Sequence, residues 1–453
     1  MKIINLSVFL LLAVATSLFG EEEIVVPLSA QSELSPLYLD TFANNSAGFD
    51  KSYLAQLEKV LSFDLNYNGR TTVIAKTKPY LTHVAREKGW KSFDQNGWKN
   101  LHATYVVKAM VADHKLSASI YLVRDNLIKT IEGMTLSGSL SEDRRKIHHL
   151  ADAIHEALFK TRGIASTHML YTVRKKVGES SATWQTEVWE ADYDGNNKRQ
   201  ITREGHLCIT PAYLPTKLGG RCNHFLYVSY RIGQPKIYVA SLREGSSKRL
   251  TYLRGNQLMP SISPQKDMVA FISDITGNPE LFIQPFDLEQ GTVGKPFQIF
   301  SAPSGAQGSP TFCPDGKEIA FVSNKDGSPR IYIMPIPAFG SSVKDLKPRL
   351  ITKQNRDNTS PAWSPDGHKI AYCALTKGVR QIWIYDFDTS KESQLTEGLE
   401  HKENPTWGPD GIHLLYNSST KNSAELYLIN LNQKETVRIS SGPGEKRFPS
   451  WEA

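Results

Sequence analysis

The sequence predicts an α/β N-terminal domain followed by an all-β six-bladed β-propeller that the C-terminal strand closes. Two observations predict the propeller: a proline-containing phrase recurs every 44 to 51 residues, and each copy is followed by short runs with strand character. A third observation, helical periodicity in place of this repeat before residue 163, predicts the separate N-terminal domain.

The repeated phrase reads "SPTFCPDGKEIAFV" at 309–322 and "SPAWSPDGHKIAYC" at 360–373. Its first prolines are Pro211, Pro260, Pro310, Pro361, Pro405 and Pro449. Pro-Asp-Gly predicts a turn, because proline presets φ and glycine tolerates positive φ. A second apolar run and a polar "RLIT"-like run follow in most copies. Each period therefore holds about four short strands, which is the size of one propeller blade.

The two ends of the repeat complete each other. Residues 168–202 read as a blade without its first strand, and "FPSW" at 448–451 reads as a first strand with no blade after it. Pairing the two gives six blades in a closed ring. Closure also removes the exposed strand edges that invite aggregation.

The N-terminal domain is predicted from four segments. An apolar stripe at helical spacing predicts a helix over 49–64, and a β-prone run predicts a strand over 71–75. Residues 104–123 read as a β-hairpin with a possible third strand after it. A second helix is expected over 141–163, with Ser141 as its N-cap and Gly163 as its stop. We place the domain boundaries at 21–163 and 167–453.

The first 20 residues predict a cleaved signal peptide. Lys2 precedes an apolar core at 8–15, and small residues follow it. This core is too short to span a bilayer, and we expect an exported, periplasmic monomer with no direct membrane insertion. The net charge of +7 is spread along the chain without a basic stripe, so we expect no nucleic-acid binding.

The four cysteines could form disulfides in an oxidising compartment. Cys208 with Cys222 is the first pair to test, since both fall in the second blade. Cys313 and Cys373 occupy positions that Ser364 and Val322 hold in sister blades, which favours blade packing over a bridge.

The motifs of common catalytic sites are missing from the sequence. It has no G-x-S-x-G elbow, H-E-x-x-H, C-x-x-C or glycine-rich phosphate loop. We therefore predict no catalytic residues and no cofactor. A hydrolase or lyase that uses the propeller channel for a small substrate stays as the alternative function.

Two features resemble metal sites but lack the required spacing. His148 and His155 are two helical turns apart, whereas chelating helix histidines are three or four residues apart, so we expect these histidines to be solvated. "DYDGNN" at 192–197 has its glycine in the fourth place of the loop, and a calcium loop has it in the sixth. A hairpin turn explains this segment better. We predict no metal site.

Aromatic residues recur at one place of the repeat, namely Tyr213, Phe312, Trp363, Trp407 and Trp451. They could form a ligand cage. Because the same position recurs in each blade, packing between blades is the better interpretation.

The loop before each inner strand varies between blades, and loops on a rigid scaffold often carry function. Its polar groups and one methionine suit a folded partner that buries roughly 1,200 to 2,000 Å². The predicted binding residues are Asn256, Gln257, Met259, Gln307, Gly308, Asp357, Asn358, Thr359, Glu403 and Asn404.

The leader, the α/β domain, the six blades, "EVWEADYDGNN" at 187–197 and the closing "FPSW" together resemble the TolB family, the periplasmic propellers of the Tol–Pal system. The resemblance implies a non-enzymatic scaffold that supports outer-membrane integrity and constriction during cell division. It implies binding of the lipoprotein Pal through one propeller face. It also implies binding of TolA through the mature N-terminal segment, here Glu21, Glu22, Glu23, Ile24, Val25 and Val26.

The chain departs from the family pattern at three places. "PTKLGGRCNH" at 215–224 and "PQKD" at 264–267 replace Pro-Asp-Gly in the second and third blades, and Pro27 follows the N-terminal segment. The chain also ends soon after "FPSW".

Overall fold

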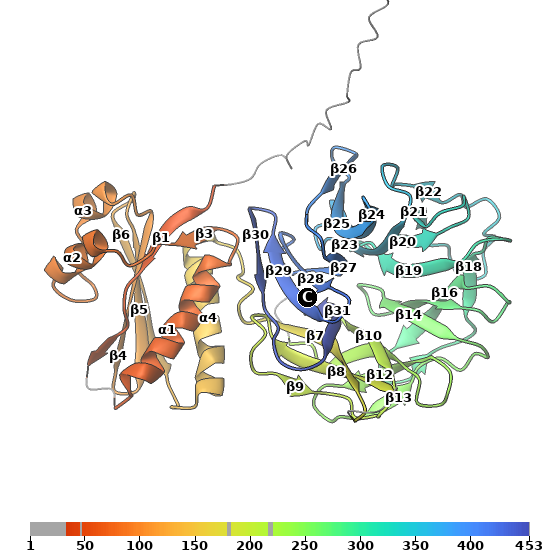
Figure 1. Ribbon diagram of the computed structural model, residues 1–453, viewed down its shortest axis with the longest axis horizontal. Helices are drawn as coiled ribbons and strands as arrows, with labels where there is room; N and C mark the ends of the chain where they lie inside the picture. The colour runs from red at the N-terminus through yellow and green to blue at the C-terminus, as the bar shows by residue number, and fades with distance from the viewer. Residues whose placement is uncertain (1–32, 46–47, 179–182, 216–220, 453) are drawn as a thin grey trace, which may run out of the picture.

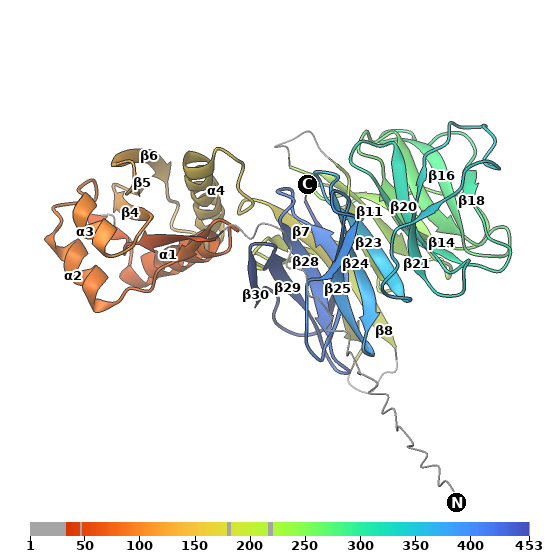
Figure 2. The same ribbon diagram turned by 90° about the horizontal axis from the view of Figure 1, so that it is seen from above.

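The computed structural model describes residues 33–45, 48–178, 183–215 and 221–452, and shows an α/β region beside a β-propeller (Figures 1 and 2). The predicted leader at 1–20 and the segment Glu21 to Val26 lie outside the described residues. Within the described part of the chain, no helix is both long and apolar enough to cross a bilayer.

The N-terminal region is built on one mixed sheet in the order β3-β1-β4-β5-β6, with β2 beside β4. Its strands are β1 (Ser35–Leu39), β2 (Ala43–Asn45), β3 (Thr71–Val73), β4 (Tyr105–Ala112), β5 (Lys115–Leu122) and β6 (Leu127–Thr135). Its helices are α1 (Lys51–Asn66), α2 (Lys78–Arg86), α3 (Gln95–Asn100) and α4 (Leu140–Phe159). The pairs of β1 with β3 and β4 are parallel, and those within β4-β5-β6 are antiparallel.

The two faces of this sheet bury separate apolar sets. Leu57 of α1 and Ile154 of α4 pack with Val107 on one face. Trp98 of α3 packs with Tyr38 on the other. This alternation along β1 and β4 follows the two-residue period of a strand.

The predicted helix over 49–64 and the strand over 71–75 are confirmed as α1 and β3, and the hairpin over 104–123 as β4 and β5. The bounds of the last helix were wrong at both ends. Ser139, not Ser141, occupies the N-cap position. The helix ends at Phe159 because Lys160 adopts φ 61°, so Gly163 lies beyond it.

The first turn of α4 is held by the Asp143 carboxylate, which is fully buried. It accepts hydrogen bonds from the Ser137 and Gly138 amides at 2.8 and 2.9 Å, from the Tyr53 hydroxyl, and from Lys146 Nζ at 2.7 Å. Burial alone would raise the pKa of Asp143, but these donors outweigh it and lower the pKa to about 2.

The C-terminal part is a six-bladed propeller, as predicted (Figure 1). Blade 1 contains β31 (Glu445–Trp451), β7 (His168–Lys176), β8 (Trp184–Asp192) and β9 (Arg199–Gln200). Blade 2 contains β10 (Cys208–Tyr213), β11 (His224–Ser229), β12 (Lys236–Ser241) and β13 (Ser247–Arg249). Blade 3 contains β14 (Gln257–Ile262), β15 (Met268–Ser273), β16 (Glu280–Asp287), β17 (Gly291–Thr292) and β18 (Phe297–Phe300).

The next three blades repeat this order. Blade 4 contains β19 (Gln307–Phe312), β20 (Glu318–Ser323), β21 (Arg330–Pro335) and β22 (Arg349–Leu350). Blade 5 contains β23 (Asn358–Trp363), β24 (Lys369–Thr376), β25 (Val379–Asp386) and β26 (Lys391–Gln394). Blade 6 contains β27 (His401–Trp407), β28 (His413–Ser419), β29 (Ala424–Asn430) and β30 (Gln433–Arg438).

The predicted closure of the ring is confirmed. β31 pairs antiparallel with β7, from Trp451 opposite Met169 to Glu445 opposite Arg174. The last strand of the chain is therefore the inner strand of the blade that begins the propeller.

The repeated aromatic residues pack between blades, as predicted. Trp363, Trp407 and Trp451 are 9, 6 and 4% exposed. Trp407 Nε1 donates a hydrogen bond to the Ala362 carbonyl of the preceding blade at 2.9 Å. The ring therefore carries no aromatic ligand cage at this position.

The suggested disulfide between Cys208 and Cys222 does not form. Cys208 lies opposite Ser229 at one end of the β10–β11 hairpin, whereas Cys222 precedes Phe225 at the other end. The two thiols are separated by the length of a strand, so sharing a blade does not bring them together.

The segment between the two parts is buried. Ile164, Ala165 and Thr167 are 4 to 5% exposed, and the Asp152 carboxylate accepts hydrogen bonds from the Ala165 and Ser166 amides at 2.8 and 2.9 Å. The separation into 21–163 and 167–453 as independently folding domains stays a prediction.

Candidate functional site

The inner strands β10, β14, β19, β23, β27 and β31 contact one another in sequence and form a ring. Each is interrupted by a register shift at its proline. The residue before each proline has a φ between 45° and 54°, and these residues are Thr210, Met259, Ser309, Ser360, Asn404 and Phe448. The ring thus carries six equivalent β-bulges, a feature that redirects side chains near functional sites.

Three of the ten predicted binding residues begin inner strands and are buried. Gln257, Gln307 and Asn358 are 0, 5 and 0% exposed. Gln257 Nε2 donates to the Gly255 carbonyl at 2.8 Å, and Asn358 Nδ2 donates to the Asn355 carbonyl at 2.8 Å. These three side chains hold the preceding loops in shape, and their contact with a partner stays a prediction.

The other seven lie at least partly exposed at the same end of the inner strands. We call this set the loop face, and it consists of Asn256, Met259, Gly308, Asp357, Thr359, Glu403 and Asn404. Their binding of a partner stays a prediction.

Ion pairs link the loop face across blades 5, 6 and 1. Arg380 lies 3.3 Å from Asp357 Oδ2 and 3.7 Å from Glu403 Oε1. Glu403 Oε2 lies 3.5 Å from Arg447 of β31. The two acidic side chains are therefore held in place before any partner arrives, which reduces the entropy lost on binding.

The N-terminal region docks at the opposite end of the blades. The Tyr67 carbonyl is 2.9 Å from His413 Nε2, and the Gly69 carbonyl accepts a hydrogen bond from Asn432 Nδ2 at 2.8 Å. His413 follows the turn after β27, and Asn432 lies in the turn after β29. Because the loop face lies where β27 begins, docking leaves it open.

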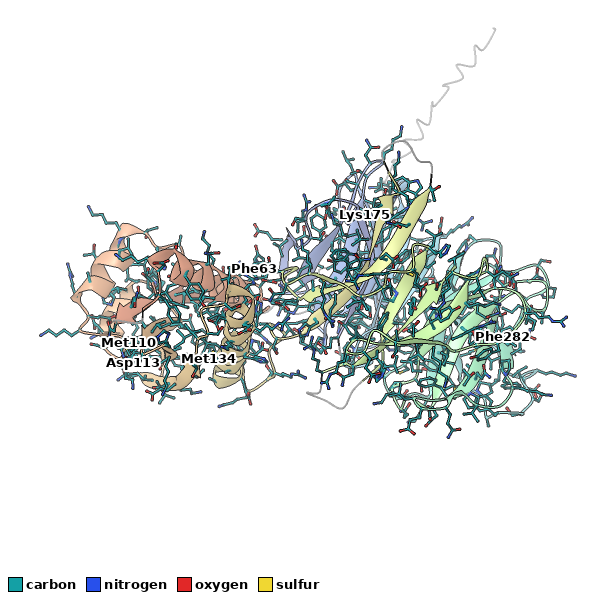
Figure 3. All side chains as sticks on the ribbon, turned by 90° about the horizontal axis from the view of Figure 1, so that it is seen from below. Phe63, Met110, Asp113, Met134, Lys175 and Phe282 are labelled. Carbon is teal, nitrogen blue, oxygen red and sulfur yellow. The ribbon has the colours of Figure 1, made fainter. Side chains whose placement is uncertain are left out.

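Side chains of α1 and blade 1 fill the contact between the two parts. Phe63 lies on the side of the α/β region that faces the propeller (Figure 3), and its ring centroid is 5.9 Å from that of Tyr193. The Tyr193 hydroxyl donates a hydrogen bond to Asp64 Oδ1 at 2.8 Å. The junction is therefore both apolar and hydrogen-bonded.

His148 and His155 are buried, at 1 and 7% exposure, so the prediction that they are solvated was wrong. Helix α4 lies against α1 and blade 1, which covers the face that carries both residues. His148 Nδ1 is 2.8 Å from Asp64 Oδ2. Burial alone would lower the pKa of His148, but the carboxylates of Asp64, Asp194 and Asp192 raise it to about 8.

The "DYDGNN" segment forms the hairpin turn between β8 and β9, as predicted. Gly195 adopts φ 81°, and a Cβ atom there would lie 1.6 Å from the Ile439 carbonyl oxygen. Only glycine fits. The turn also reaches the α/β region, where Asp194 pairs with Arg144. Sequence patterns do not reveal this contact, since the two residues are 50 positions apart.

A cavity of about 270 Å³ opens beside this turn. It is lined by α4, by residues 162 and 165–168, and by turns of blades 1, 2 and 6, with Arg145, Arg162, His148, Asp192 and Arg221 among its lining residues. Sequence reasoning missed this site, because its residues come from six separate segments of the chain.

The thiols are poorly suited to nucleophilic chemistry. Burial raises the pKa of Cys313 and of Cys373 to about 11, and burial with two nearby glutamates raises that of Cys208 further. At neutral pH these three side chains are protonated, whereas the thiolate is the nucleophile.

Comparison with known proteins identifies the family. Residues 155–453 match the model for the TolB beta propeller domain. The chain belongs to the TolB family. The Protein TolB homolog of Protochlamydia amoebophila is 51% identical over 84% of this chain and 82% of its own length. The Protein TolB homolog of Chlamydia trachomatis serovar D is 36% identical over 88% of this chain and 84% of its own length.

A solved structure agrees with the fold. The crystal structure of TolB from Acinetobacter baumannii superimposes with a TM-score of 0.75 at 22% identity, covering 93% of this chain and 97% of that one. The TolB likeness thus extends beyond the propeller to the α/β region.

Proposed function

We propose that the protein is a non-enzymatic periplasmic scaffold of the Tol–Pal system, which binds Pal through the loop face and TolA through its mature N-terminal segment. In this role it supports outer-membrane integrity and constriction during cell division. Family membership carries the proposal. The names of the relatives give no reason to prefer a hydrolase or lyase in the channel.

The chemistry of the loop face supports a folded protein partner. It offers two carboxylates, Asp357 and Glu403, held by Arg380 and Arg447. Met259 is 39% exposed and supplies a soft apolar contact at the ring of inner strands. A small apolar centre with a polar surround is the usual composition of a protein–protein interface.

The position of the loop face also supports the proposal. The α/β region occupies the other end of the propeller through His413 and Asn432. A partner on the loop face would therefore meet a rigid ring without displacing the α/β region.

Charge reversal tests the Pal proposal. Replacing Glu403 by Lys and Thr359 by Arg together should weaken binding of purified Pal by about 1 to 3 kcal/mol, as expected for central contacts. Loss of the Glu403 ion pairs costs about 0 to 1 kcal/mol each, and repulsion of the new cations by Arg380 and Arg447 adds a cost of similar size, so the protein should stay folded. Isothermal titration measures the affinity, and thermal unfolding checks the fold.

Asp315→Lys is the matched control. Asp315 is exposed in the Pro-Asp-Gly turn of blade 4, at the end of the propeller away from the loop face. This variant should bind Pal normally. If the double variant binds Pal as tightly as the unaltered protein does, Pal does not use the loop face. Turnover of a substrate that depended on Glu403 would instead favour the alternative function, a hydrolase or lyase.

Deletion of Glu21 to Val26 tests the TolA proposal. A short β-prone run with free backbone groups can add as a strand to a partner. The deletion should abolish TolA binding in a pull-down with purified proteins and leave Pal affinity unchanged. Equal TolA binding by the shortened chain would refute this assignment.

A further inference from the structure

Two features that separately lack the pattern of a metal site meet at the domain junction. His148 projects from α4, Asp192 is the last residue of β8, and Asp194 lies in the turn that follows. Their nearest ligand atoms all lie within 4.8 Å of one another, and all three residues are buried. We propose that His148, Asp192 and Asp194 bind a divalent transition-metal cation of the Zn²⁺ type, which joins the α/β region to blade 1.

The two distances from His148 Nε2 fit a shared ion better than direct hydrogen bonds. His148 Nε2 lies 3.8 Å from Asp192 Oδ2 and 3.9 Å from Asp194 Oδ2. A hydrogen bond requires about 2.7 to 3.2 Å. Two ligand atoms that are each about 2.1 Å from one ion lie between about 3.4 and 4.2 Å apart, depending on the angle at the metal.

The buried ring nitrogen needs a partner. Among the described residues, no protein group hydrogen-bonds to His148 Nε2, although the side chain is only 2% exposed. Buried polar atoms are nearly always paired, and each exception requires an explanation. The cavity beside the turn is lined by His148 and Asp192, so an ion can reach them.

The groups around the three ligands are arranged as in metal sites. Asp64 Oδ2 accepts the Nδ1 proton of His148, so Nε2 is the ring nitrogen that faces Asp192 and Asp194 and would exchange its proton for the metal ion. Asn197 Nδ2 donates to Asp192 Oδ2 at 2.6 Å. A carboxylate behind a ligating histidine and hydrogen bonds to ligating carboxylates are the usual outer partners of a bound metal.

The charges favour a divalent cation. Three carboxylates, of Asp64, Asp192 and Asp194, surround His148, and Arg144 pairs with Asp194. The carboxylates outnumber the one permanent cation of the cluster, Arg144, and a bound metal ion would replace the Nε2 proton of His148. A divalent ion offsets the excess negative charge. This stabilises the folded protein, because an uncompensated buried charge is strongly destabilising.

An anion in the same cavity is the competing possibility. Arg145, Arg162 and Arg221 line the cavity, but all three side chains are exposed. Next to Nε2 an anion would meet the carboxylates of Asp192 and Asp194 and be repelled. The cluster itself therefore selects a cation.

The test uses the full chain without a histidine tag, stripped of metal by a chelator and titrated with Zn²⁺. Isothermal titration should show one strong site per chain, and thermal unfolding should shift to higher temperature with Zn²⁺. His148→Gln should weaken that site by more than about 100-fold, since changes in outer partners alone weaken metal binding by about 10- to 100-fold. Asp64→Asn should weaken Zn²⁺ binding by only about 10- to 100-fold.

His149→Gln is the control, because His149 lines the same cavity but is exposed. It should bind Zn²⁺ within about twofold of the unaltered protein. If His148→Gln does not fold, Asp192→Asn provides the second variant, and the absorption spectrum of bound Co²⁺ should show the loss of a ligand. Failure to bind Zn²⁺, or equal binding by His148→Gln and Asp192→Asn, would refute the site. Stabilisation by inorganic phosphate in place of Zn²⁺ would refute it in favour of an anion.

Discussion

Ring closure by β31 buries Trp451 in the core beside blade 1. Its side chain is 4% exposed, and its Nε1 donates a hydrogen bond to Thr167 Oγ1 at 2.7 Å. Trp451→Ala removes a buried indole, which costs about 3 to 5 kcal/mol, and one hydrogen bond, which contributes about 1 kcal/mol. We expect the free energy of unfolding to fall by about 4 to 6 kcal/mol in urea denaturation followed by tryptophan fluorescence.

Trp184→Ala is the matched control in the same blade. Trp184 is partly exposed, and Arg174 and Lys176 lie over its ring at 4.1 and 5.5 Å. Losing these contacts should lower the free energy of unfolding by only about 1 to 2 kcal/mol. If Trp451→Ala destabilises the protein no more than Trp184→Ala, closure through β31 does not limit propeller stability.

Three further substitutions test single positions. Gly195→Ala should destabilise the protein by more than 2 kcal/mol in urea unfolding, because its Cβ would overlap the Ile439 carbonyl. Gly178→Ala is the control, because Gly178 has φ 78° but no atom of the described residues lies within 4 Å of an added Cβ. An equal loss of stability would show that the positive φ, and not the overlap, causes the effect. The pKa of Asp143 is about 2 in the folded protein and 3.8 as the ordinary value, so its carboxylate stabilises the fold above about pH 4 and this contribution is lost as the pH falls through 2. Asp143→Asn should therefore remove about 1 to 2 kcal/mol at pH 7 and almost nothing at pH 2, and a pH-independent loss would contradict the assignment. Gln257→Ala should accelerate hydrogen exchange of the backbone amides in the loop before β14, because the Gln257 side-chain amide donates to three carbonyls there. Unchanged exchange would show that the loop keeps its conformation without Gln257.

The repeat made the propeller predictable from sequence, because the same turn and strand pattern occurs in successive blades. The helices α2 and α3 were missed, since "KPYLTHVAR" and "QNGWKN" are short and mostly polar. Strand β1 was also missed, because its partners β3 and β4 are parallel and distant along the chain. Local patterns do not reveal such pairing.

The contact between the α/β region and blade 1 could not be predicted from the sequence, for a different reason. The helical pattern of α4 predicts that His148 is exposed to solvent. In the folded protein that face of α4 is covered by a segment more than 40 residues later in the chain. Likewise, Gln257 and Asn358 begin inner strands, and their side chains are buried against carbonyl groups of the loops that precede them. In both cases burial is decided by tertiary contacts that no single sequence window contains.

The pairing of β31 with β7 has a consequence for the order of assembly. Residues 168–176 precede the strand that covers their inner edge by more than 260 residues. Until residues 445–451 pair with it, β7 presents a row of unpaired amides and carbonyls to any other chain nearby. A molecule that folds from its N-terminal end therefore passes through an open arc, and we expect chaperones that bind exposed strand edges to recognise it until the last seven-residue strand has paired with β7.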